Sequence, residues 1–379
     1  RKPNIMTKIL KISFASLWML FALVAQGQEH SHAGASPIEY PNIPGYLSLK
    51  TDFHIHSVFS DGNVWPSIRV QEALRENLDA ISLTEHLEYQ PHKSDIPHPD
   101  RNRAHEIALK EAADHGLLII RGSEITRALP VGHNNAIFIQ DANPILQEAA
   151  EDAFKEAKKQ GAFVFWNHPA WYVQQPNGTP ALSDFQKERI KNDELHGIEV
   201  INTGDYSEEA LQIALDNGLT IMGTSDVHDL IDWDYTEKAQ HRPITLVFAK
   251  EKTAASLLEA LKNGRTVAVF NDLLVGKSEF LNPLIKASVT ATDLKYIGKT
   301  QVLSVTLHNH SSSDLLFENQ MSFSLYRHSP VFTIPAGESI TLQIKTLERK
   351  DSIVLTLKAL GAFTAPKVQP IIEWELKID

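Results

Sequence analysis

Two histidines stand one residue apart in the segment 51–62, which reads TDFHIHSVFSDG. Successive side chains of a strand point to opposite faces, so His54 and His56 point to the same side. Imidazole is the most common nitrogen ligand of first-row divalent metals in proteins, and two imidazoles on one face form half of a metal site. Asp61 follows in a Ser-Asp-Gly turn, where the chain can curl back and offer a carboxylate. This segment alone is a weak signal, so other strands must bring further ligands to the same point.

Further polar side chains follow other apolar segments of the chain. Segment 79–83 ends in Thr84-Glu85-His86, segment 117–123 ends in Glu124, and Gly132-His133-Asn134 precedes the segment 135–139. Segment 162–166 ends in Asn167-His168-Pro169, and segment 219–224 ends in Ser225-Asp226-Val227-His228. The collected candidates are six histidines and three carboxylates: His54, His56, Asp61, His86, Glu124, His133, His168, Asp226 and His228. These side chains predict a metal centre of nitrogen and oxygen ligands.

The spacing of these candidates predicts the elements that position them. Short apolar strands alternate with amphipathic helices, which we expect over residues 65–77, 104–115, 147–160, 207–217 and 253–263. This alternation favours parallel strands, closed as a (β/α) barrel or doubly wound. Candidates at the carboxyl ends of strands are typical of a barrel whose chemistry lies on that face. Strands 244–248 and 266–270 would complete this domain, and the polar segment 88–103 reads as a long surface loop over the strand ends.

The second part of the chain has a different pattern. Strands are expected over residues 284–292, 301–308, 321–326, 339–346, 352–360 and 371–378, with turn residues between them and no helical period. We predict a small all-β sandwich of immunoglobulin-like architecture. The predicted domains are residues 48–280 for the barrel and 281–379 for the sandwich.

The N-terminal residues 1–27 read as a secretory signal, with Met6 as the start. Basic residues precede an apolar run over residues 12–24, and Ala25-Gln26-Gly27 offers small residues before a cut. The alternative is an uncleaved N-terminal anchor. With cleavage, we expect a periplasmic or secreted protein without a membrane span, beginning near Gln28 with an extended arm over residues 28–47.

Composition excludes several kinds of function. The net charge of −11 argues against a dedicated nucleic-acid or anionic-membrane binder, although bound metal cations can reverse the local field for a small anionic substrate. The chain has no cysteine, so disulfides, thiolate zinc sites and cysteine nucleophiles are excluded. The sequence carries no signal of oligomeric state.

The order and spacing of the motifs resemble the polymerase and histidinol phosphatase (PHP) family of phosphoesterases over residues 49–270. The resemblance implies a distorted, usually seven-stranded (β/α) barrel with three metal ions. His54, His56, Glu124 and Asp226 would hold one ion. Glu124 would bridge to a second ion with His133 and His168, and the third would be held by Asp61, His86 and His228. We further expect His54, His56, Asp226 and His228 to take part in catalysis.

The resemblance implies a secreted metal-dependent hydrolase of phosphate monoesters or diesters. Two or three divalent transition ions (Zn, Mn or Fe) would suit these ligands, and a metal-bridging hydroxide would attack phosphorus. The expected partner is a small phosphorylated substrate. Its phosphate would contact Lys93, Arg101, Arg103 and Arg127, although each of these could equally be a solvated surface charge.

Other side chains beside the ligands have supporting roles in this interpretation. Asp52 and Glu85 are expected to accept hydrogen bonds from imidazole N–H groups. Trp171 and Tyr172 could line a pocket, although packing is the more common role of such a tryptophan.

Two alternative functions stay open at this point. An amidohydrolase-type enzyme cleaving C–N or C–O bonds also starts with His-x-His, but it often uses a carboxylated lysine, and no lysine ends the corresponding strand here. A non-catalytic binding protein on a degenerate barrel is disfavoured because no ligand position has been lost.

Overall fold

The computed structural model describes residues 37–238 and 240–378. The predicted signal segment 1–27 and residues 28–36 of the predicted arm lie outside the described residues. Residues 37–46 of that arm contain no helix, and Ile38 and Ile43 in it are buried. Among the described residues, no helix is long and apolar enough to cross a membrane.

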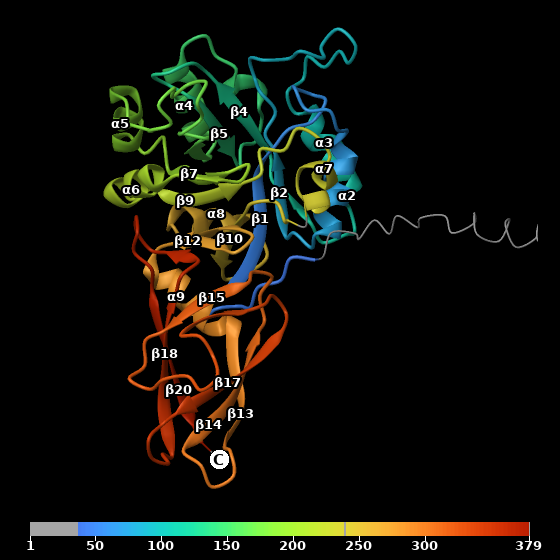
Figure 1. The fold of residues 1–379 in the computed structure, drawn as a ribbon. Coiled ribbons are helices and arrows are strands. Elements are labelled where there is room, and N and C mark those ends of the chain that lie inside the picture. The colour runs from blue at the N-terminus through green and yellow to red at the C-terminus, as the bar shows by residue number, and fades with distance from the viewer. Residues whose placement is uncertain (1–36, 239, 379) are drawn as a thin grey trace, which may run out of the picture. The chain divides into compact units, whose positions relative to one another are not determined.

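The first sheet of the α/β domain has the order β19-β12-β11-β10-β1-β2-β3 (Figure 1). Its strands are β1 (Leu47–Ile55), β2 (Ala80–Leu83), β3 (Leu118–Ile119), β10 (Ile244–Ala249), β11 (Thr266–Phe270), β12 (Leu273–Gly276) and β19 (Ala362–Phe363). β1 pairs parallel to β2 and antiparallel to β10. Eight of the nine residues of β1 are buried, and they include the polar side chains of Lys50, Asp52 and His54, which alternate with its apolar ones.

The second sheet has the order β4-β5-β6-β7-β8, with β9 beside β7. Its strands are β4 (Gly122–Thr126), β5 (His133–Ile137), β6 (Phe163–Trp166), β7 (Gly197–Asn202), β8 (Asp205–Tyr206) and β9 (Thr220–Thr224). Two isolated bridges, His86–Glu124 and Ile55–Val227, join the two sheets. The two bridges thus close a circuit of seven strands: β1, β2, β4, β5, β6, β7 and β9. The predicted distorted (β/α) barrel is confirmed.

One strand of this circuit runs against the predicted parallel direction. β5 pairs antiparallel with both β4 and β6. The ladder between β4 and β5 ends at the pair Thr126–His133. Because β5 is reversed, its first residue lies at the edge where its neighbours end. His133 therefore reaches the candidate centre from the start of a strand.

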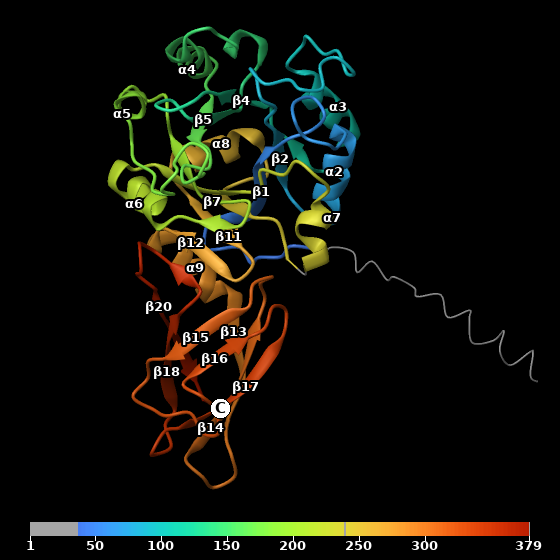
Figure 2. The same cartoon turned by 45° about the horizontal axis from the view of Figure 1, so that its top comes forward.

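Helices cover the outside of the strands. They are α2 (Pro66–Arg75), α3 (Arg103–Glu111), α4 (Ala150–Lys159), α5 (Asp184–Lys191), α6 (Glu208–Asn217), α7 (Ile231–Asp234) and α8 (Ala254–Lys262), with 3₁₀ turns η1 (Asn143–Ile145) and η2 (Thr236–Lys238). Figures 1 and 2 show α2, α3 and α7 grouped beside β2, and α6 beside β7. The caps explain two of the boundaries, because the Thr253 hydroxyl accepts from Ser256 N at the start of α8 and Gly218 ends α6 in the left-handed region.

The C-terminal domain is an all-β sandwich. Its sheets have the orders β13-β14-β17 and β16-β15-β18-β20. The strands are β13 (Val289–Tyr296), β14 (Val302–Asn309), β15 (Leu315–Asn319), β16 (Val331–Ile334), β17 (Ser339–Lys345), β18 (Ser352–Ala359) and β20 (Ile371–Lys377). Phe317 and Trp374 meet edge to face in its core, with ring centroids 6.1 Å apart.

One predicted strand of this region, 321–326, is wrong, and another, 284–292, is confirmed only over residues 289–292, which lie in β13. Residues 284–288 belong to the helix α9 (Ser278–Ser288), which contains Pro283 and crosses the predicted domain boundary at residue 280. Residues 321–326 form no strand, and β15 and β16 on either side were not predicted. β19 leaves the sandwich and pairs with β12, so a segment of the C-terminal domain extends the first sheet.

Candidate metal centre

All nine predicted ligand side chains come together at one end of the barrel. Their ligand atoms form four overlapping groups, each within 4.8 Å and each able to hold a metal ion. These groups are His56–Asp61–His86–His228, His54–Glu124–His168, His54–His56–Asp226 and His86–Glu124–His133. The nine residues lie on, or within a few residues of, six strands (β1, β2, β4, β5, β6 and β9), which explains why short sequence motifs far apart in the chain can build one centre.

His54 and His56 form the buried base of the centre. Their Nε2 atoms lie 3.1 Å apart, and both side chains are fully buried. Asp226 Oδ1 is 3.0 Å from His54 Nε2 and 3.2 Å from His56 Nε2. Glu124 Oε2 lies 3.1 and 3.3 Å from the same two nitrogens. Two imidazoles and two carboxylates therefore direct ligand atoms toward one point.

A second set of contacts surrounds Asp61. Its carboxylate lies 3.3 Å from His86 Nε2 and 3.2 Å from His228 Nε2. The ring of His56 stacks between those of His86 and His228, at centroid distances of 4.5 and 4.4 Å. Gly62 makes this turn possible, because a Cβ there would lie 2.8 Å from the backbone carbon of His56.

The other oxygen of Glu124 reaches the opposite side of the centre. Its Oε1 lies 2.6 Å from His133 Nδ1 and 3.3 Å from His86 Nδ1. His168 completes this side, and its Nδ1 is buried without a hydrogen-bond partner among the described residues. Glu124 thus contacts members of all four groups, as a bridging carboxylate would.

The electrostatics of the centre favour positive charge. Burial opposes ionisation of Glu124 and Asp226, but the surrounding imidazoles hold the pKa of each well below its ordinary value. Burial likewise disfavours the charged form of His86, yet Glu124 and Asp61 outweigh it and raise the pKa of His86 to about 11. Buried carboxylates that stabilise cationic imidazoles would also stabilise divalent cations. The donor set of nitrogen and oxygen atoms fits transition metals.

Glu199 is a site residue that sequence reasoning missed. It lies fully inside β7, and its Oε1 is 2.7 Å from His54 Nδ1. The hydroxyl of Thr224 donates to the same oxygen at 2.6 Å, while Oε2 accepts from the backbone N–H of His168 at 2.5 Å. Glu199 thereby fixes the His54 ring with Nε2 toward the centre. A carboxylate within an apolar strand was the available sequence signal.

Two ligand residues adopt backbone conformations that are uncommon for residues other than glycine. Asp226 has φ of 53° and His168 has φ of 28°. Asp226 N donates to His54 O at 2.9 Å, and the preceding Ser225 hydroxyl donates to Asp52 at 2.6 Å. Hydrogen bonds to neighbouring strands therefore hold both strand ends in the turn that aims these side chains inward.

The predicted roles of Asp52 and Glu85 as imidazole acceptors are wrong. Asp52 accepts from Ser225 and pairs with Arg242 at 3.1 Å. Glu85 accepts from the hydroxyls of Ser57 and Ser60. Both carboxylates support the loops that carry ligands, and the acceptor for His54 is Glu199.

The four predicted phosphate-binding cations lie away from the lining of the cavity at the centre. Arg127 pairs with Glu88 at 2.9 Å, and Arg103 pairs with Glu106 on the surface of α3. Arg101 donates to the carbonyl of His98 at 3.2 Å, and Lys93 is exposed. Among the residues that line the cavity, Lys238 is the basic one other than histidine. A role of the four cations in substrate binding stays a prediction.

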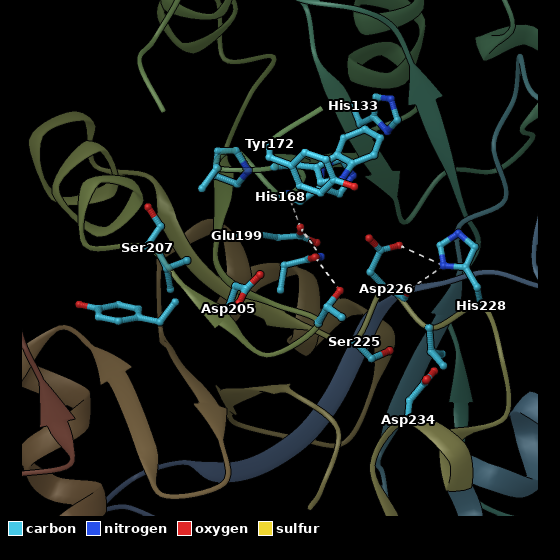
Figure 3. Close-up of a pocket in the computed structure, with 18 of the residues that line it drawn as sticks. His133, His168, Tyr172, Glu199, Asp205, Ser207, Ser225, Asp226, His228 and Asp234 are labelled. Carbon is cyan, nitrogen blue, oxygen red and sulfur yellow. Dashed lines mark hydrogen bonds and ion pairs between the residues drawn. The ribbon is translucent and has the colours of Figure 1, made fainter. Parts of the chain in front are cut away.

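A cavity of about 780 Å³ opens over the metal centre (Figure 3). Six of the predicted ligands line it, namely Asp61, His86, His133, His168, Asp226 and His228, together with Trp171 and Tyr172. A volume in this range suits a small organic ligand. His54, His56 and Glu124 lie beneath the surface.

The fold and the buried ligand cluster define a protein with a candidate metal centre in an α/β barrel and an appended β-sandwich. A solved two-domain protein from Bacteroides vulgatus, which contains a predicted PHP-like metal-dependent phosphoesterase, matches with a TM-score of 0.83 and 40% identity over 91% of this chain and 99% of that chain. The chain therefore belongs to this family of two-domain PHP-like proteins. A family model described as an Ig-like domain matches residues 289–375, which agrees with the sandwich.

Three further similarities are weaker. A structure from Bifidobacterium adolescentis, described as a metal-dependent phosphoesterase, is 20% identical over 48% of this chain and 89% of that chain, with a TM-score of 0.36. An amidohydrolase from Chromobacterium violaceum is 17% identical over 47% of this chain and 87% of that chain, with a TM-score of 0.36. A prokaryotic Roc-COR-CHAT protease is 28% identical over 100 residues, which are 26% of this chain and only 9% of that protein.

Proposed function

We propose that the protein is a metal-dependent phosphoesterase that hydrolyses phosphate monoesters or diesters at the nine-residue centre. The observation that carries this proposal is the convergence of six imidazoles and three carboxylates beneath an open cavity. Membership of the PHP-like family supports the same reaction class. Divalent ions held there would neutralise phosphoryl oxygens and lower the pKa of water.

The protein's own residues would have distinct tasks in this reaction. Glu124 can bridge because its two oxygens face different imidazoles, His54 and His133. Glu199 holds His54 in one tautomer, so that its Nε2 is available to a cation. His228 has a partly exposed side chain at the cavity, and it is the ligand best placed to meet the leaving oxygen of an ester.

The proposal is tested by metal content and hydrolysis in one experiment. We expect two or three transition-metal ions per chain by mass spectrometry, after loading with Mn²⁺ or Zn²⁺. The loaded protein should hydrolyse bis(p-nitrophenyl) phosphate or p-nitrophenyl phosphate, and the faster substrate separates a diesterase from a monoesterase. The His54→Ala/His56→Ala double variant should lose both metal and activity.

The matched control is a His308→Ala/His310→Ala double variant. These histidines are hydrogen bonded to threonines on the β-sandwich, outside the nine ligand residues. The control should retain full metal content and turnover. A protein that binds no transition metal, or that turns over equally well without His54 and His56, would exclude this reaction and leave a binding protein as the better interpretation.

The extracytoplasmic location is a separate proposal that rests on residues 1–27. Export would place the enzyme where it meets small phosphate esters from outside the cell. Mass spectrometry of protein from a periplasmic or culture fraction should give an N-terminus near Gln28. An N-terminus at Met6 would contradict cleavage.

A further inference from the structure

The cavity extends well beyond the metal ligands. One arm of it is formed by the turn after β7 and by the segment around α7 and η2, through Thr203, Asp205, Tyr206, Asp234 and Lys238. In Figure 3, Asp205 and Ser207 lie on the side opposite Asp226 and His228. A phosphate group alone would occupy a small part of the volume of about 780 Å³, so the arm has room for the organic part of an ester.

The arm carries excess negative charge. Asp205, Asp229 and Asp234 line the cavity outside the nine predicted ligands, and Lys238 is the opposing cation there. Asp205 has no ion-pair partner within 4.0 Å among the described residues, and neither has Asp234. Bound metal ions would neutralise the ligand carboxylates but not these three acids. The arm would therefore repel a second anionic group while the metal centre attracts the first.

Aromatic rings form much of the remaining wall. Trp171 is 37% exposed, and its ring centroid lies 5.1 Å from that of His168 and 5.6 Å from that of His133. Tyr172 beside it is 73% exposed, so its ring is accessible to a ligand in the cavity. Tyr206 and Tyr235 line the arm, and the Tyr235 hydroxyl donates to Thr203 O at 3.1 Å. Flat rings next to a metal centre provide stacking surfaces for rings of a substrate.

We propose that the cavity selects phosphate esters in which an uncharged, ring-bearing group fills the acidic aromatic arm, and that it rejects esters with a second phosphate on that group. This inference rests on the proposed phosphoesterase function and deepens it by naming the substrate class. Asp205 and Asp234 would act as specificity determinants through charge, and Trp171 through ring contact.

The test uses three esters with one chromophore and one scissile bond type. They are methyl p-nitrophenyl phosphate, thymidine 5′-(p-nitrophenyl phosphate) and the same thymidine ester with an additional 3′-phosphate. Thymidine serves as an uncharged ring-bearing probe. For the metal-loaded protein, kcat/KM should be at least about tenfold higher for the thymidine ester than for the methyl ester. The additional 3′-phosphate should lower kcat/KM of the thymidine ester at least about tenfold.

Substitutions of cavity residues test which side chains produce these two ratios of kcat/KM. In the Asp205→Asn/Asp234→Asn protein, the penalty for the 3′-phosphate should shrink about tenfold. In Trp171→Ala, the advantage of the thymidine ester over the methyl ester should fall, mainly through KM. The control is Asp184→Asn/Asp216→Asn, which removes two exposed acids that do not line the cavity and should keep the wild-type ratios.

The outcomes separate this inference from the proposed function. If no ester is hydrolysed in a metal-dependent way, the proposed function fails and this inference fails with it. If esters are hydrolysed but the 3′-phosphate substrate is processed equally well, or the methyl ester as fast as the thymidine ester, the inference alone is overturned. If the Asp205→Asn/Asp234→Asn protein and its control show the same penalty for the 3′-phosphate, Asp205 and Asp234 do not determine the specificity.

Discussion

At the scale of single residues, the centre depends on a carboxylate that holds ligand side chains in place without belonging to the nine predicted ligands. Glu199 contacts His54 Nδ1, Thr224 and the backbone of His168, and it is fully buried. It therefore couples a ligand of β1 to a ligand that follows β6. Such a group acts by fixing the orientation of ligands rather than by contacting the substrate.

We predict that Glu199→Gln lowers metal affinity or activity about 10- to 100-fold. Glutamine keeps the size of the side chain but removes the charge that favours the correct His54 tautomer. Metal affinity can be measured by competition with a chromogenic chelator, and kcat with bis(p-nitrophenyl) phosphate. Glu251→Gln, at an exposed position outside the cavity, is the control. A Glu199→Gln protein with unchanged metal affinity and kcat would contradict the positioning role.

The protonation of the ligands predicts how metal affinity depends on pH. Although burial disfavours the charged form of His86, the carboxylates of Glu124 and Asp61 raise its pKa to about 11, so the metal-free site holds this proton at neutral pH. A metal ion must displace it, and affinity should rise with pH, by about tenfold per pH unit for each proton displaced. Titrations with Mn²⁺ at pH 6.5, 7.5 and 8.5 measure the slope. A flat or falling dependence would show that His86 is not a ligand.

The ligand residues could be predicted because each one lies next to an apolar strand in a recognisable motif. Glu199 was missed because it lies within a strand, where its contacts come from two other strands and leave no local pattern. The four predicted cations, three in the long loop and Arg127 after Glu124, were chosen by proximity in sequence, but Arg127 pairs with Glu88 and does not line the cavity. Long, flexible side chains can reach several partners, so their direction depends on tertiary packing.

At the scale of elements, the sequence pattern was informative about burial but less so about pairing. Residues 321–326 alternate in hydrophobicity, and Met321, Phe323 and Leu325 do pack against the core, yet they form no ladder. Residues 284–288 were predicted as part of a strand but belong to α9, which contains Pro283, a residue that cannot donate a backbone hydrogen bond. The helix forms nonetheless, since Phe280, Leu281, Leu284 and Ile285 are buried along one side.

A buried ion-pair network connects β1 to the end of α2. Arg242 lies 3.1 Å from Asp52 on β1 and 2.5 Å from Glu76 at the C-cap of α2, and all three side chains are fully buried. Burial opposes its charge, but Glu76 and Asp52 raise the pKa of Arg242 above its ordinary value. Asp52 also accepts from Ser225, which precedes the ligand Asp226.

We predict that Arg242→Met lowers the free energy of unfolding by about 3–5 kcal/mol, because it leaves two carboxylates buried without their partner. Urea denaturation followed by circular dichroism measures the change. Arg75→Met is the matched control, since Arg75 pairs with Asp232 at the surface. This substitution should lower the free energy of unfolding by at most about 1 kcal/mol. Equal effects of the two substitutions would contradict the assignment of this network as a stabilising element.

At the scale of the whole molecule, metal binding should stabilise the fold. The ligands come from strands throughout the barrel, so ions held among them would connect segments from His54 to His228. We predict that chelation with EDTA lowers the melting temperature by about 5–10 °C, which corresponds to about 2.7 kcal/mol for a ligand present at 100 times its dissociation constant.

Differential scanning calorimetry with and without Mn²⁺ measures this shift. The His54→Ala/His56→Ala protein is the control, and its melting temperature should not respond to EDTA. The shift should appear in the transition that unfolds the barrel, because the ions would be held there. A transition that is insensitive to chelation in the wild-type protein would argue against ions within the centre.

The central claim is that nine side chains from across the barrel hold metal ions at one place. Anomalous X-ray diffraction from crystals grown with Mn²⁺ or Zn²⁺ tests it most directly. We predict two or three peaks, between His54, His56 and Asp226, between Glu124, His133 and His168, and around Asp61, His86 and His228. The absence of peaks among these residues, in crystals whose metal content is confirmed by fluorescence, would contradict the account.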